Sequence, residues 1–195
     1  MTMRIQELLS RLCSPGAAAR ESAALEIFRL GRAPADQAVQ PWLTDLEFSS
    51  LLGGKPAATV GVAVYPDRFA AIRAANGSPR LADVPPDQDA REFELHFANA
   101  VQLDVLTTRE PRGSGAIAKF LEKFGEGVQQ VEFRCSNVDR ATQILKDKFA
   151  ANAVYPATRP GADATRVNFF LVPSHSGAKV LIELYEPGKR EGLSS

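Results

Sequence analysis

The chain has 195 residues, of which 45% are hydrophobic and 24% are charged, which is typical of a folded globular protein and excludes a disordered one. Its 23 basic and 23 acidic side chains balance, so no overall field attracts nucleic acid or an anionic membrane surface. The longest apolar runs, such as 60–65, fall far short of the roughly 20 residues that span a bilayer. Cys13 and Cys135 have no metal-like spacing. We therefore expect a reduced, cytoplasmic protein that binds neither nucleic acid nor a membrane.

The first 54 residues predict a small helical extension. Four apolar residues recur at the spacing of one helix face, namely Ile5, Leu8, Leu9 and Leu12. A second helix follows, which we expect to end at Gly31, and a third segment covers 35–52. The stretch 19–31 resembles one helix of a HEAT-type repeat, and 53–56 is a linker. Two roles stay open for the extension: packing on the main domain, or docking a protein partner.

From residue 58 the pattern changes to strands, and one order of elements occurs twice. A strand, a helix and further strands follow each other over 58–108 and again over 128–187. The third strand of the first module is the least clear of the set. Where the first strand meets the helix, Asp67-Arg68 mirrors Asp139-Arg140. This internal duplication predicts one domain built from two similar modules.

Several segments resemble methylmalonyl-CoA epimerases in order and spacing, namely 117–128, 159–161, 166–169 and 180–184. These enzymes belong to the vicinal oxygen chelate superfamily, which also contains glyoxalases, dioxygenases and bleomycin resistance proteins. The resemblance is good over 101–187, weaker over 58–100 and absent over 1–57. It implies an α+β fold in which paired βαβββ modules form a cupped mixed sheet, here a glyoxalase-like domain over 58–187 preceded by the helical extension. A homodimer is a further expectation from the resemblance.

The resemblance also implies a divalent metal held by one side chain from the first and one from the last strand of each module. In the epimerases these are two His, a Gln and a Glu. The matching positions here are Asp104, Gln130 and Glu183, with Ala58, Thr59 or Val60 on the first strand. Both histidines are missing, and an all-oxygen set suits Mg²⁺, Mn²⁺ or Ca²⁺. We therefore expect no cofactor, with a divalent cation at Asp104, Gln130 and Glu183 as the alternative.

Alternation along the strands gives each one an apolar and a polar face. If the polar faces share one cup, Glu94, Asp104 and Glu183 are its candidate catalytic bases. The candidate substrate-binding residues are His96, Gln130, Glu132, Arg134, Arg166, Asn168 and Tyr185. Arg134 or Arg166 would suit an anionic group. The alternative is structural, with Arg–carboxylate pairs that hold the sheet together in place of the metal.

Three functions remain open from the sequence. The cup can bind a small molecule without the usual metal, or the protein can be a divergent isomerase or lyase of an acyl or carbonyl substrate with a carboxylate-rich metal site. The third option is a scaffold that binds a partner through the helical extension. Epimerase activity itself is not expected, because that chemistry depends on a metal to stabilise an enolate. The sequence does not identify the ligand.

Overall fold

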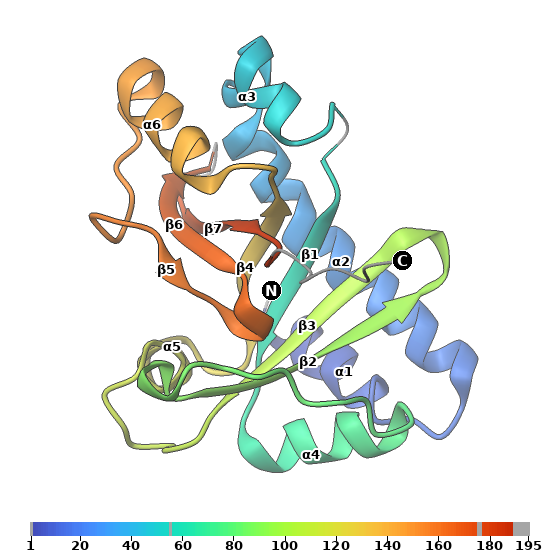
Figure 1. The fold of residues 1–195 in the computed structure, drawn as a ribbon. Helices are drawn as coiled ribbons and strands as arrows, with labels where there is room; N and C mark the ends of the chain where they lie inside the picture. Colours follow the sequence, from blue (N-terminus) through green and yellow to red (C-terminus); the bar gives the residue numbers. More distant parts are fainter. Residues whose placement is uncertain (1, 55, 175–176, 189–195) are drawn as a thin grey trace, which may run out of the picture.

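A single mixed sheet, with helices packed against it, organises the chain (Figure 1). The computed structural model describes residues 2–54, 56–174 and 177–188. Within these ranges the sheet has seven strands in the order β2-β3-β1-β4-β7-β6-β5. The strands are β1 (Ala58–Ala63), β2 (Ala90–Phe97), β3 (Val101–Thr108), β4 (Gly127–Arg134), β5 (Arg159–Pro160), β6 (Arg166–Pro173) and β7 (Lys179–Glu186).

The helices connect these strands and cover the sheet. The described α-helices are α1 (Thr2–Arg11), α2 (Ala17–Val39), α3 (Leu46–Leu51), α4 (Pro66–Ala75), α5 (Ala116–Phe124) and α6 (Val138–Phe149). Short 3-10 turns are η1 (Trp42–Thr44), η2 (Pro86–Gln88), η3 (Ala98–Ala100) and η4 (Ala162–Ala164). Among the described residues, no helix has both the length and the apolar composition to cross a bilayer.

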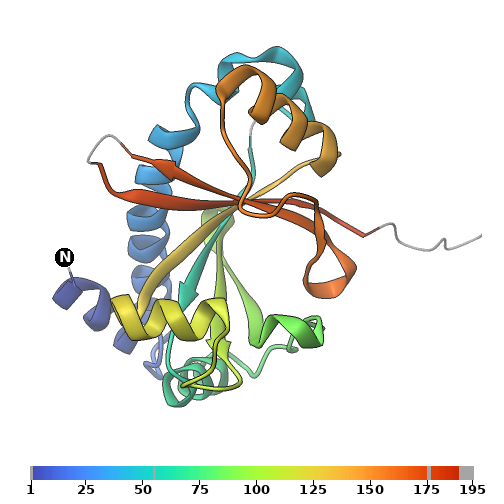
Figure 2. The ribbon, with the colours of Figure 1, turned by 90° about the vertical axis from the view of Figure 1, so that its left-hand side faces the viewer.

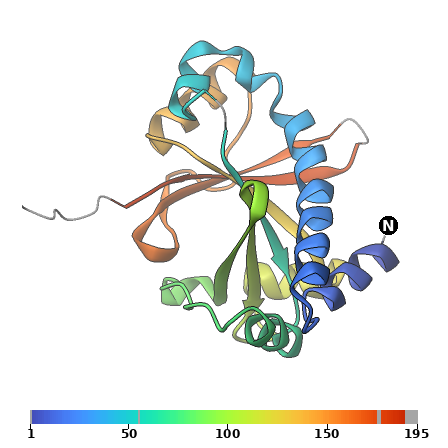
Figure 3. The same ribbon diagram turned by 90° about the vertical axis from the view of Figure 1, so that its right-hand side faces the viewer.

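The two predicted modules meet at β1 and β4, which pair antiparallel in the middle of the sheet. In each module the first strand pairs parallel with the last, so Gly61 lies opposite Asp104 as Glu132 lies opposite Glu183. In the side views β6 and β7 cross the direction of β1 and β3 steeply, and the sheet curls into a half-barrel (Figures 2 and 3). The predicted α+β fold with a cupped mixed sheet is confirmed.

The first module differs from the second in its outer strand. Residues 78–89 form no strand, and only the amide of Ala82, which donates to the carbonyl of Glu92, pairs with β2. Pro79, Pro85 and Pro86 lack the N–H groups that a ladder needs, which explains the missing strand. The segment instead runs toward the second module, where it helps to form the site described below.

Helix α2 packs against the strands at the centre of the sheet and runs along one face of it (Figure 3). Gly31 permits the contact, because a Cβ at this position would lie 2.5 Å from Cγ1 of Val60 and 3.1 Å from Cγ1 of Val128. The prediction that the helix ends at Gly31 is wrong, since α2 continues past Pro34 to Val39. Gly31 serves helix-to-sheet packing here and is not a cap.

The helical extension shares one hydrophobic core with the sheet. Leu9, Leu12 and Ile27 are fully buried in the same cluster as the strand residues Val60 and Val131. Trp42 lies in this core too, with its ring centroid 5.8 Å from that of Phe170 and 5.9 Å from that of Phe48, both in edge-on geometry. The helices of the extension therefore lie on the outer face of the sheet and leave the concave face to the site.

Candidate functional site

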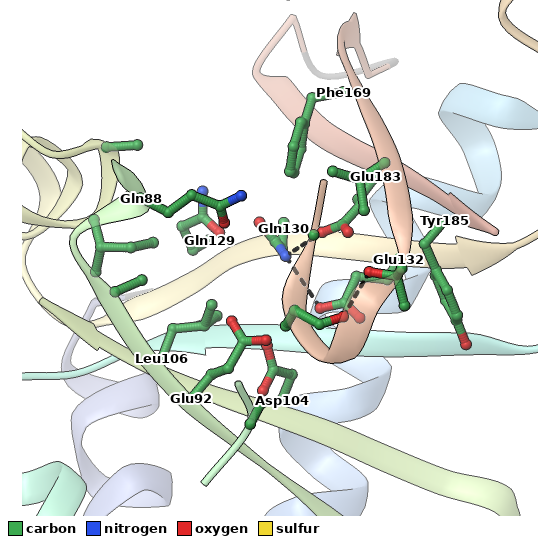
Figure 4. A pocket seen from close by; sticks show the side chains of 18 of the residues that line it. Gln88, Glu92, Asp104, Leu106, Gln129, Gln130, Glu132, Phe169, Glu183 and Tyr185 are labelled. Atoms are coloured by element: carbon green, nitrogen blue, oxygen red, sulfur yellow. Dashed lines mark hydrogen bonds between the residues drawn. The ribbon is translucent and has the colours of Figure 1, made fainter. Parts of the chain in front are cut away.

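The concave face of the sheet holds a cavity of about 640 Å³, called the cup here (Figure 4). This volume lies within the range of pockets that bind small molecules. Residues from β2, β3, β4, β6 and β7 line it, together with the start of α5 and the segments 79–88 and 154–165. Strands supply most of the polar groups, so these groups are held on a rigid frame.

Four carboxylic side chains form the floor of the cup, and each comes from a different strand: Glu92, Asp104, Glu132 and Glu183 (Figure 4). Strand alternation and register explain why they meet. Glu132 and Glu183 are direct neighbours across β4 and β7, while Glu94 lies opposite Asp104 across β2 and β3. Residues that face each other across a pair of strands project to the same side.

Gln130 links two of these carboxylates. Its Nε2 donates to Oε1 of Glu132 at 3.1 Å and to Oε2 of Glu183 at 2.6 Å (Figure 4). Its side chain lies over Gly61, where a Cβ would be 2.6 Å from Cγ of Gln130. The missing side chain at Gly61 therefore makes room for the amide at the centre of the floor.

The floor carboxylates lack a positive partner. In the described residues none of the four forms an ion pair with Lys or Arg, and Oδ1 of the buried Asp104 has no hydrogen-bond partner. Burial, with repulsion from neighbouring carboxylates, raises the pKa of Glu92 to about 7. Burial raises the pKa of Glu132 to about 7 as well, and places the pKa values of Asp104 and Glu183 well above their usual range. Near neutral pH the floor therefore holds protons as well as negative charge.

An apolar wall stands on one side of this floor. Val167 and Phe169 of β6, Leu181 of β7 and Tyr155 face the cup. The Tyr155 and Phe169 rings lie edge-on with centroids 6.0 Å apart. A polar floor under an aromatic and aliphatic wall suits an organic molecule that is polar at one end and apolar at the other.

Two segments meet at the mouth of the cup, residues 79–88 of the first module and 159–163 of the second. Arg80 NH1 donates to Oδ1 of Asp163 at 3.0 Å, and the Arg159 guanidinium lies 2.7 Å from Asp87. Gln88 Nε2 donates to the carbonyl oxygen of Pro160 at 2.6 Å. The two arginines that line the cup are thus paired with mouth carboxylates and do not neutralise the floor.

The predicted site residues fall into two groups. Glu94, Asp104, Gln130, Glu132, Glu183 and Tyr185 all line the cup, and their roles remain predictions. The other four lie outside its lining. His96 is exposed at the end of β2, with Nε2 2.9 Å from Glu94 and Nδ1 3.2 Å from Gln102, and Arg134 is exposed at the end of β4.

Strand β6 faces the opposite way from the prediction. Arg166 pairs with Asp139 and Glu186 away from the cup. Asn168 is fully buried on the helix-packed face, opposite Leu184. Residues 169–172 are apolar on both faces, so alternation alone could not orient the strand. The pairing of Phe169 with Glu183 does orient it. The expected anion-binding Arg166 and polar Asn168 are replaced in the cup by Val167 and Phe169.

Sequence reasoning also missed residues that the structure places in the cup. Glu92 lies two positions before Glu94 and shares its face, so the same alternation could have identified it. The mouth segment 79–88 offered no such signal, because its contacts with 159–163 join chain positions about 80 residues apart.

No protein-family model and no curated protein sequence matches the chain. Among solved structures, methylmalonyl-CoA epimerase from Mycobacterium tuberculosis is 32% identical, and the match covers 68% of this chain and 87% of that one with a TM-score of 0.55. The chain belongs to the vicinal oxygen chelate superfamily. A Streptomyces coelicolor methylmalonyl-CoA epimerase variant in complex with 2-nitronate-propionyl-CoA, at 23% identity, 68% and 97% coverage and a TM-score of 0.52, shows the same fold. A hypothetical protein from Bacillus halodurans does so as well, at 21% identity, 69% and 95% coverage and a TM-score of 0.55.

Other residues stand at two of the positions where the superfamily usually has metal ligands. Gly61 of β1 pairs with Asp104 of β3 in the same way as Glu132 of β4 pairs with Glu183 of β7. Thr59 lies two residues before Gly61, and Gln130 lies two residues before Glu132, so Thr59 is the counterpart of Gln130. Thr59 faces the cup side of β1, and Gln130 directs its amide nitrogen toward the two glutamates. In the part of the chain that the structure describes, no three His, Cys, Asp or Glu side chains are arranged to hold a metal ion. The side chains in this arrangement therefore do not fit the superfamily's metal centre.

Proposed function

We propose that this protein binds a small organic molecule in the cup without the superfamily's metal. The observation that carries the proposal is the shape and chemistry of the cavity, about 640 Å³ with a hydrogen-bonding floor and the apolar wall around Phe169. The S. coelicolor relative was solved with an acyl-CoA analogue, which supports the idea that this fold accepts organic ligands. Methylmalonyl-CoA epimerase activity is not part of the proposal, because Thr59 and Gln130 stand where that chemistry uses metal-binding histidines.

A second candidate is proton-transfer catalysis on a carbonyl compound, favoured by the pKa values of Glu92 and Glu132. At about 7 they are suited to both accepting and donating a proton near neutral pH. Glu183 and Asp104, whose pKa values burial raises well above their usual range, would act as hydrogen-bond donors to a carbonyl oxygen. This candidate predicts that the full chain catalyses exchange of α-protons of a small ketone or thioester for deuterium, and that Glu132→Gln abolishes the exchange.

Binding in the cup is tested with two variants of one cross-strand pair. Leu181 lines the cup, while its neighbour Leu171 is 50% exposed and lies outside the lining. Leu181→Trp fills part of the cavity, and Leu171→Trp adds the same bulk beside it. We expect a fragment library screened by ligand-observed NMR to yield ligands for the native chain and for Leu171→Trp that are lost with Leu181→Trp. Equal binding to both variants, or no ligand at millimolar concentration, would refute the proposal.

A further inference from the structure

The floor of the cup is acidic, and its charge indicates which class of ligand it can bind. Glu92, Asp104, Glu132 and Glu183 project into one cavity, and the described residues bring no lysine or arginine to them. Gln130 offers both of its amide protons to Glu132 and Glu183, which leaves Glu92 and Asp104 without its help. The floor therefore has more acceptors than the protein supplies with donors.

Asp104 shows this shortage directly. Its side chain is 5% exposed and lines the cup, and its Oδ1 has no hydrogen-bond partner. A buried carboxyl oxygen without a hydrogen-bond partner is costly, and folded proteins pair nearly all such atoms. Asp104 and Glu92 both line the cup, and their carboxyl groups are near enough for repulsion between them to raise the pKa of Asp104 (Figure 4). A donor from outside the chain would satisfy them.

The two arginines that line the cup already have other partners. Arg80 and Arg159 hold Asp163 and Asp87 respectively. The apolar side of the cup adds a second property that the ligand should have. Phe169 and Tyr155 offer ring surfaces, which suit a ligand with an apolar part. Aromatic rings next to carboxylates are a setting in which proteins bind organic cations.

We propose that the molecule bound in the cup carries a positively charged nitrogen, an alkylammonium or a guanidinium, which the floor carboxylates hold while the wall around Phe169 contacts its apolar part. This inference rests on the proposed function, since it names the charge class of the same ligand. An ammonium group brings up to three N–H donors to the unpartnered acceptors of Asp104 and Glu92. A metal ion is the other cation to consider. It needs several donors at 2.0–2.6 Å, whereas the described side chains offer no such group of three, and the Gln130 amide lies between two of the acids.

Binding of a cation should change the number of protons that the floor carboxyl groups hold. A floor that holds protons near neutral pH must release them when a positive charge takes their place, up to about one proton per ligand. An alkylammonium remains charged across the range from pH 6 to 8, as a lysine side chain does. Its affinity should therefore rise with pH over this range, while the affinity of a neutral ligand of the same shape should not.

The test uses three probes of similar shape on the full chain: phenethylamine, 2-phenylethanol and phenylacetate. We expect phenethylamine to bind about 10- to 100-fold more tightly than the alcohol at pH 7.5, the range for a charge-assisted hydrogen bond, and phenylacetate not to bind. Asp104→Asn and Glu183→Gln should each weaken the amine about tenfold or more, whereas the exposed-surface control Glu122→Gln should leave it unchanged. Titration calorimetry in buffers of different ionisation heat should show proton release on amine binding.

Each other outcome decides the question. Tighter binding of the alcohol or of phenylacetate, lost with Leu181→Trp, would overturn the cationic ligand and leave small-molecule binding intact. Amine binding that survives both Leu181→Trp and Asp104→Asn would place it outside the cup and overturn the inference. If neither the probes nor library fragments bind, the proposed function fails as well. Stoichiometric binding of Mn²⁺ or Mg²⁺ alone, lost in Asp104→Asn, would replace the organic cation with a metal.

Discussion

Replacing Glu132 with glutamine should stabilise the protein at alkaline pH and have little effect at acidic pH. The Glu132 side chain is 9% exposed and accepts a hydrogen bond from Gln130, yet burial raises its pKa to about 7. A carboxyl group whose pKa is higher in the folded than in the unfolded chain binds more protons when folded. Its favourable contribution is complete below the unfolded value near 4.5 and is lost as the pH rises through about 7. Glutamine keeps the shape and the acceptor oxygen but does not titrate.

The size of the effect follows from the two pKa values. A rise from 4.5 to about 7 corresponds to about 3 kcal/mol, at about 1.4 kcal/mol per pKa unit. Between pH 5 and pH 8, Glu132→Gln should therefore gain up to about 3 kcal/mol of unfolding free energy relative to the native chain. For a chain of this size that is a shift in Tm of about 6–12 °C.

Urea denaturation followed by circular dichroism at pH 5 and pH 8 measures this difference. Glu122→Gln removes one carboxylate from the exposed surface of α5 and should show the same small effect at both pH values. A Glu132→Gln variant that is destabilised at pH 8, or whose effect does not change between the two pH values, would show that Glu132 is ionised at little cost. Burial would then not destabilise the ionised floor at alkaline pH.

Two further predictions concern the packing of the helical extension and the metal. Gly31→Ala places a methyl group 2.5 Å from Cγ1 of Val60 and should destabilise the fold by about 1–3 kcal/mol in urea denaturation. Gly16→Ala, whose new methyl would have no neighbour closer than 3.7 Å, should cost little, and equal effects of the two variants would contradict the packing described. Metal analysis of protein purified without chelators should find no stoichiometric divalent ion; an ion lost in Asp104→Ala plus Glu183→Ala would instead place a metal on the floor.

The acidic floor could largely be predicted from sequence because apolar and polar residues alternate along the part of each strand that forms it. Along the stretches of β2, β3, β4 and β7 that hold these residues, buried apolar side chains alternate with polar ones, so the position of Asp104, Gln130, Glu132 and Glu183 on one shared face follows from a period of two. The resemblance to the epimerases then implies that residues from the first and last strands of each module come together. Together these two signals identified most of the carboxylates without a single known contact.

Strand β6 and helix α2 show where sequence patterns stop being informative. Residues 169–172 of β6 are apolar on both faces because one face packs Phe170 on Trp42 and the other lines the cup with Phe169. Only the register with β7 distinguishes the two faces. Gly31 carries the signal of a helix end, yet the cost of a mid-helix glycine is offset by close packing on Val60. In both cases the deciding contact is between residues distant in the chain.

Ionisation of the buried floor carboxyl groups destabilises the fold, and a positively charged ligand would offset that effect. A chain that holds Asp104 without a donor and Glu132 away from water is less stable at alkaline pH than it would be with neutral side chains. A ligand that binds only the folded state raises stability by RT ln(1 + [L]/Kd), so a cationic ligand should restore what ionisation of the floor removes. Phenethylamine should therefore stabilise the native chain more at pH 8 than at pH 5, and this pH dependence should shrink in Glu132→Gln. A neutral ligand in the same cup would stabilise both proteins without that dependence, which separates charge compensation from simple filling of the cavity.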